Sequence, residues 1–227
     1  IHAFSGEHQA AASFFTQALE TFEKLSDPAE AQKDTRQTNL YRLHNALDAG
    51  ETWENIQPLA TSVFGSDLDK AANKFSSNPN GRFTHHALLR LLAAYPQQTA
   101  SAQKNYLDNQ AHWQSEAGHP WQLIHLWRGW LAHFAGNDFI AAEAFNHTLD
   151  EEADGLTLQW IVLTTAVLAE RLGLGKSSSY PIATEAARLK TAFPQAPHAA
   201  LQTLQKSEAK PEKLLAALKA CLPFNFK

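Results

Sequence analysis

The chain has 227 residues, of which 44% are hydrophobic and 19% are charged, so its composition is that of a chain that folds around an apolar core. The net charge is −4, and the 19 Lys and Arg residues are scattered along the chain, which gives no support to binding of nucleic acid. The length suits one continuous stack of elements, and we expect a single helical-repeat domain over residues 1–227.

Breaks rich in Gly, Pro, Asn and Asp divide the chain into segments whose apolar residues recur with the period of a helix. Alternating runs typical of strands are almost absent. We therefore predict an all-α protein of stacked antiparallel helix hairpins with about eleven helices. Pro28 suits a first helical turn, and Ser66 and Asp138 are expected to cap helices by accepting hydrogen bonds from free backbone amides.

Residues 6–19 carry a pattern of small and aromatic side chains after a turn glycine. Gly6 is followed by the small residue Ala11, by the aromatic Phe15 four positions later, and by Ala18 three positions beyond that. A small residue on one helix leaves a gap for a second helix, and an aromatic side chain can fill such a gap. The pattern therefore predicts closely packed helices.

A second copy of the pattern occupies residues 136–149, with Ala141, Phe145 and Thr148 in the matching positions. The helix expected before it also fits, because Gly129 lies seven residues before the turn glycine, where close approach of the paired helix demands a small side chain. We predict that these two helices pack antiparallel in sequence.

These two regions, residues 6–19 and 120–149, resemble tetratricopeptide repeats. The resemblance implies helix pairs stacked into a solenoid, with a concave groove that binds a partner. Because residue 1 falls partway through a repeat, the resemblance also implies that an N-terminal portion precedes it.

Weaker copies centre on Gly50, on Pro96 with Ala102 and Tyr106, and on Gly175. The turns then recur at intervals of about 39 to 46 residues, rather than the 34 of tetratricopeptide repeats. This spacing indicates divergent, longer helix pairs, as in the tetratricopeptide-like domains of some bacterial regulators. An irregular helical bundle is the alternative.

A tryptophan-rich segment, residues 113–134, offers aromatic rings to two faces of one helix. Trp127, Leu131 and Phe134 follow the three-or-four spacing of a buried face, so we expect them in the core. Packing of all the rings in the core is the alternative to a binding role.

The other edge of this helix carries residue types that often dominate binding, namely tryptophan and arginine. Together with the helix expected over residues 82–94, it is predicted to line a groove on the inner face of the stack. The candidate partner-binding residues are His86, Arg90, Arg128, Trp130 and His133.

The eleven histidines do not form a metal-binding pattern. His125 and His133 are eight residues apart, about 12 Å along a helix, and so cannot share one ion. Motifs of hydrolases and nucleotide-binding loops are also absent, since the segment from Gly173 to Ser177 is better interpreted as the end of a helix. We expect no metal, no cofactor and no catalysis.

The C-terminal third contains the longest apolar stretch, Leu156 to Ala169, which is interrupted by polar residues and closed by Glu170. It is shorter than the roughly 18 residues of a membrane span, so we predict a buried helix. Cys221 has no partner within the chain and is expected to be a packed thiol, which favours a cytoplasmic location. Removal of a signal peptide before residue 1 is the alternative.

These observations predict a non-catalytic interaction module that binds a peptide or a partner protein in a concave groove. The alternative is a ligand-sensing or regulatory helical domain of a larger protein. The sequence leaves the oligomeric state and the identity of the partner open.

Overall fold

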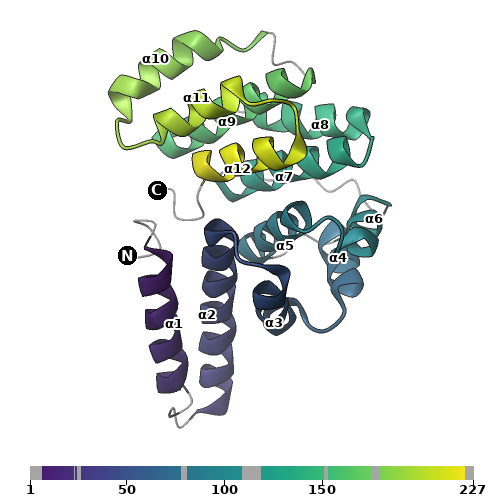
Figure 1. Cartoon of the computed structure of the whole chain (residues 1–227), viewed down its shortest axis with the longest axis vertical. Helices are drawn as coiled ribbons and strands as arrows, with labels where there is room; N and C mark the ends of the chain where they lie inside the picture. The colour runs from purple at the N-terminus through teal and green to yellow at the C-terminus, as the bar shows by residue number, and fades with distance from the viewer. Residues whose placement is uncertain are drawn as a thin grey trace. The chain divides into compact units, whose positions relative to one another are not determined.

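The structure is a computed structural model that describes residues 7–22, 24, 27–77, 81–108, 119–150, 153–174 and 179–222. Over these residues the protein is all α, with twelve helices and no strand (Figure 1). The predicted all-α class is confirmed, and twelve helices fit the predicted number of about eleven. The stacking of helix hairpins into a solenoid stays a prediction.

The chain divides into two compact units, Ile1–Ala111 and His112–Lys227. The helices of the first unit are α1 (His8–Phe22), α2 (Pro28–Ala49), α3 (Trp53–Phe64), α4 (Leu68–Ser77), α5 (Arg82–Ala94) and α6 (Ala100–Asp108). Those of the second are α7 (His119–Phe134), α8 (Asp138–Leu149), α9 (Leu156–Leu172), α10 (Ile182–Ala192), α11 (His198–Lys206) and α12 (Pro211–Cys221). The single domain expected over residues 1–227 stays a prediction.

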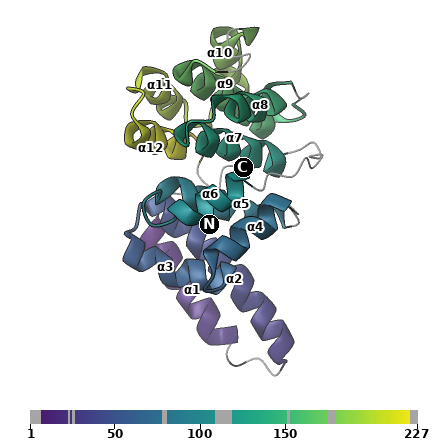
Figure 2. The same cartoon turned by 90° about the vertical axis from the view of Figure 1, so that its right-hand side faces the viewer.

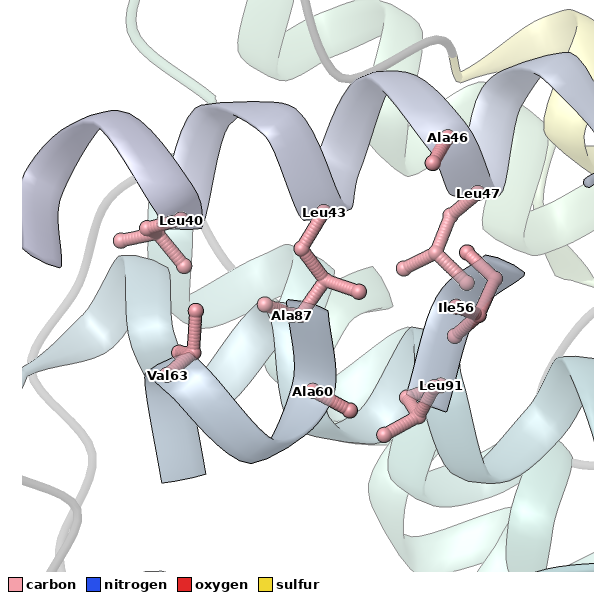
Figure 3. Packing of buried hydrophobic residues seen from close by; sticks show 9 residues of the cluster. All are labelled: Leu40, Leu43, Ala46, Leu47, Ile56, Ala60, Val63, Ala87 and Leu91. Carbon is pink, nitrogen blue, oxygen red and sulfur yellow. The ribbon is translucent and has the colours of Figure 1, made fainter. Parts of the chain in front are cut away.

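Helix α2 is the central element of the first unit, because α1, α3 and α5 all pack against it. Figures 1 and 2, which are two views turned by 90°, both show α1 and α2 side by side. The apolar side chains of α2 point toward α3 and α5 (Figure 3). This cluster comprises Leu40, Leu43, Ala46 and Leu47 of α2, Ile56, Ala60 and Val63 of α3, and Ala87 and Leu91 of α5.

The ends of α2 follow from its local sequence. The Asp27 side chain accepts a hydrogen bond from the Ala29 backbone N–H at 2.8 Å, and Pro28 occupies the first turn as predicted. At the other end Gly50 adopts the left-handed conformation with φ 71°, which lets its N–H donate to the Ala46 carbonyl.

Two other predicted caps are displaced by one residue. Asp67, and not Ser66, accepts a hydrogen bond from a backbone N–H in the first turn of α4 at 2.9 Å. Asn137, and not Asp138, caps α8 at 3.2 Å. Asp138 is already the first helical residue, and its carboxylate instead accepts a hydrogen bond from His133 Nδ1 at 2.7 Å.

Helix α6 departs from the repeat pattern. Ala102 and Tyr106 are buried, as their places in the pattern require. However, α6 packs chiefly against α4 and only slightly against α5, the helix that precedes it across the turn at Pro96. His85 of α5 reaches α6 through one buried hydrogen bond, in which its Nε2 lies 2.8 Å from the Tyr106 hydroxyl.

In the second unit α7 and α8 form the predicted antiparallel hairpin, joined by three residues. A Cβ atom built on Gly129 would lie 2.5 Å from Cε1 of Phe145, so no side chain fits there without displacing the ring. Phe145 is fully buried against this gap. The prediction of a close helix approach at Gly129 is confirmed.

Helix α9 is the centre of the second unit, because α7, α8, α10, α11 and α12 all contact it. Its buried residues run from Leu158 to Ala169 almost without interruption, which explains the long apolar stretch in the sequence. The Trp160 indole donates a buried hydrogen bond to the Cys221 carbonyl at 3.0 Å, which ties α9 to α12. The Cys221 side chain is buried as predicted, and burial raises the pKa of its thiol to about 12.

We predict that Gly129→Ala lowers the free energy of unfolding, because its Cβ would overlap the Phe145 ring. Overpacking costs about 1–3 kcal/mol, whereas alanine gains only about 1 kcal/mol over glycine in helix propensity. Urea denaturation followed by circular dichroism measures the loss. In a Phe145→Val background, which removes the overlapping ring atoms, the same substitution should be neutral or stabilising. An equal loss in both backgrounds would contradict this packing.

Candidate functional site

A cluster of polar side chains lies buried between α2 and α5. Arg90 is only 2% exposed, and its guanidinium forms an ion pair with Asp48 and donates from Nη1 to His44 Nδ1 at 2.9 Å. His44 Nε2 lies 3.3 Å from the Phe83 carbonyl. Because an arginine can only donate, Nδ1 of His44 must accept, and Nε2 then carries the proton of a neutral ring.

His86 completes this buried cluster. Its ring lies against that of His44, with 5.3 Å between the centroids, and the residue is 3% exposed. His86 and Arg90 stand one turn apart on α5, so both face α2. The structure therefore brings these two predicted site residues together, but it uses them to hold α5 on α2 and leaves almost none of their surface for a partner.

Two members of the cluster, His44 and Asp48, were not predicted from the sequence. They lie four residues apart on α2, next to the buried leucines Leu43 and Leu47. Polar residues one turn apart beside an apolar face are the signal that could have identified them. Their partner Arg90 is distant in sequence, so local periodicity does not reveal the pairing.

Burial holds the pKa of His44 well below its ordinary value of 6.5. The nearby Arg90 charge lowers this pKa further, whereas the hydrogen bond with the Phe83 carbonyl opposes both effects. The cluster therefore depends on a neutral imidazole, because a protonated His44 would lose its acceptor and repel Arg90.

The remaining predicted site residues lie together on α7 in the second unit. Arg128 and His133 are half-buried, and His133 pairs with Asp138. Trp130 is 3% exposed, with its ring centroid 4.5 Å from that of Phe134. This burial counts against Trp130 as a side chain presented to a partner, and partner binding by this group stays a prediction.

The two faces of α7 differ from the expectation at two positions. Trp127 and Leu131 are core residues as predicted, but Phe134 is 37% exposed and Trp130 is buried in its place. Phe134 is the last residue of α7, where the helix gives way to the turn. A residue at a helix end can follow the apolar period without being covered.

A groove of about 420 Å³ lies between α1, α2 and α3 of the first unit. Its apolar lining residues are Ala12, Phe15, Ala46, Ala49 and Leu59, and its polar ones are His8, Gln9, Arg42, Asn45, Glu51 and Asn55. None of these residues was among the predicted site residues. The groove depends on the packing of three helices, which no single helix pattern reveals.

Hydrogen bonds order the polar side chains of this groove. Asn45 joins α1 to α2, since its Oδ1 accepts from His8 Nδ1 at 2.8 Å and its Nδ2 donates to the His8 carbonyl at 3.2 Å. Glu51 accepts from Asn55 Nδ2 at 2.8 Å. Arg42 donates from Nη1 to Asn39 at 3.2 Å, which leaves other N–H groups of its guanidinium for a bound molecule.

The described part of the chain contains neither a candidate metal site nor a candidate membrane-spanning helix. No group of three or more His, Cys, Asp or Glu side chains among the described residues could hold a metal ion. Of the described helices, none has the length and apolar character needed to cross a membrane.

Comparison of the chain with models of protein families, with curated proteins and with solved structures found no match. The resemblance to tetratricopeptide repeats therefore stays a prediction, and the geometry of the first unit carries the argument about function.

We predict that Arg90→Met lowers the free energy of unfolding by about 3–5 kcal/mol, because it leaves the buried Asp48 without its counter-charge. The matched control is Arg188→Met, which removes a partly exposed ion pair with Glu185 and should cost about 1 kcal/mol or less. Urea denaturation of both variants measures the difference. Equal losses would show that the buried ion pair does not hold α2 and α5 together.

We also predict that stability falls as the pH drops below about 6.5. His44 takes up a proton in the unfolded chain near its ordinary pKa of 6.5 but resists protonation in the folded protein. The contribution of the neutral His44 ring to the free energy of unfolding is therefore fully present above pH 6.5. This contribution is lost toward lower pH, at up to about 1.4 kcal/mol per pH unit.

Urea denaturation at several pH values between 8 and 5 measures this slope. The variant His44→Gln should have a shallower slope than the wild type, because it removes the group that titrates. A wild-type slope retained in His44→Gln would contradict the assignment.

Proposed function

We propose that the protein is a non-catalytic helical interaction module whose first unit binds a peptide or a partner helix in the groove between α1, α2 and α3. The observation that carries this proposal is the combination of apolar and ordered polar side chains in a groove of about 420 Å³. Binding pockets commonly have volumes of about 300–1,000 Å³ and a similar mixture of side chains.

The small residues of the groove favour a helical or extended peptide as its occupant. Ala12 and Ala49 are exposed alanines on α1 and α2, and they leave room for the side-chain ridge of an incoming helix. Phe15 and Leu59 supply apolar surface for an anchoring side chain. Arg42 can hold a carboxylate or a carbonyl oxygen of the bound segment.

Binding without catalysis is favoured by the way the titratable groups of the groove are used. The side chains of His8 and Glu51 are each hydrogen-bonded to an asparagine side-chain amide, which is not a nucleophile. The same groove volume also suits a small molecule, so a ligand-sensing or regulatory helical domain is the second candidate function.

A selection from a library of displayed peptides, followed by calorimetry on the selected sequences, tests the proposal. We predict that Ala49→Trp weakens binding of the selected peptides at least tenfold, about 1.4 kcal/mol, because the indole fills the groove. Ala49 is exposed, so the fold should tolerate the change. The control is Ala183→Trp, at an exposed alanine of α10 in the second unit, and it should leave binding unchanged.

The proposal fails if no peptide is selected, or if the selected peptides bind Ala49→Trp as tightly as the wild type. If only substitutions in the second unit weaken binding of the selected peptides, the binding site lies in that unit, where α7 carries the other candidate residues. Competition by a small molecule would instead support the second candidate function.

A further inference from the structure

A second cavity of about 420 Å³ lies in the first unit, against the N-terminal half of α2. It is separate from the groove in its residues, since it uses residues 29–40 of α2 and the groove uses residues 42–49. Its lining residues are Ala29, Gln32, Lys33, Arg36, Gln37, Leu40, Val63 and Thr84.

The charge of this cavity is of one sign. Lys33 and Arg36 stand one turn apart on α2, and no acidic side chain of the described chain lines the cavity, although the whole protein has a net charge of −4. The acidic residues Glu30 and Asp34 also lie on α2. Within the described residues, neither of them forms an ion pair with Lys33 or Arg36.

The polar groups around these two cations can all donate hydrogen bonds. Gln32 and Gln37 offer side-chain amide N–H groups, and Thr84 of α5 offers a hydroxyl. The apolar part of the lining is formed by Ala29 and by the buried residues Leu40 and Val63. An occupant that combines an anionic group with an apolar body would match both parts of the cavity.

We propose that this cavity binds a phosphate monoester. The two exposed cations match the charge of about −1.5 to −2 that a monoester carries at neutral pH better than they match a single carboxylate. An arginine can hold two phosphate oxygens at once, and a lysine adds a point charge beside it. The monoester can belong to a small organic phosphate or to a phosphorylated side chain of a peptide.

NMR titration of the full chain at constant ionic strength tests this proposal, with phenyl phosphate and a phosphoserine peptide as separate probes. The variant Lys33→Gln/Arg36→Gln should weaken binding at least tenfold. The matched control is Lys70→Gln/Lys74→Gln, which removes the same charge from two equally exposed positions of α4 in the same unit and should leave binding within about twofold of the wild type.

Tighter binding of one probe identifies the source of the phosphate, and saturable binding of either probe that depends on Lys33 and Arg36 supports the site. The proposal is overturned if neither probe binds, or if the two double variants lose affinity equally, since the latter would reflect the overall charge of the unit. Ala49→Trp should not affect either probe, so failure of the groove and failure of this cavity are distinguishable.

Discussion

The first unit depends on how the buried charge of Arg90 is neutralised. A charged group in the protein interior is strongly destabilising unless it has an opposite charge and hydrogen-bond partners. Asp48 supplies the charge and His44 supplies the acceptor, and both come from α2, so these contacts join Arg90 of α5 to one place on that helix. Because α1 and α3 also pack on α2, the groove and the cationic cavity are both built on a helix that this cluster holds in place.

The second unit is organised by steric fit rather than by charge. Two of its helices approach closely at Gly129, where the Phe145 ring occupies the space of a side chain. Around this hairpin the apolar helix α9 provides a surface for five other helices. A steric constraint of this kind can be recognised from the sequence, because the glycine and the aromatic residue lie in adjacent helices at a fixed spacing.

The difference between the units explains what the sequence could predict. Helices, their approximate number and the contact at Gly129 follow from local periodicity and turn residues. The sequence could not show that Trp130 is buried and Phe134 partly exposed, because both residues follow Trp127 at spacings that place them on the same face of α7 as Trp127. The cluster around Arg90 joins residues that are more than 40 positions apart in the sequence. The lining of the groove comes from three different helices, so only the folded chain brings these residues together.

The protonation state of His44 tests this account most directly. Long-range ¹H–¹⁵N correlation spectra of the imidazole distinguish the two tautomers and follow the ring through a pH titration. The account predicts a neutral ring at pH 7, with the proton on Nε2 and with Nδ1 accepting from Arg90, that stays neutral well below pH 6.5. A proton on Nδ1 at pH 7, or a titration midpoint near 6.5, would contradict it.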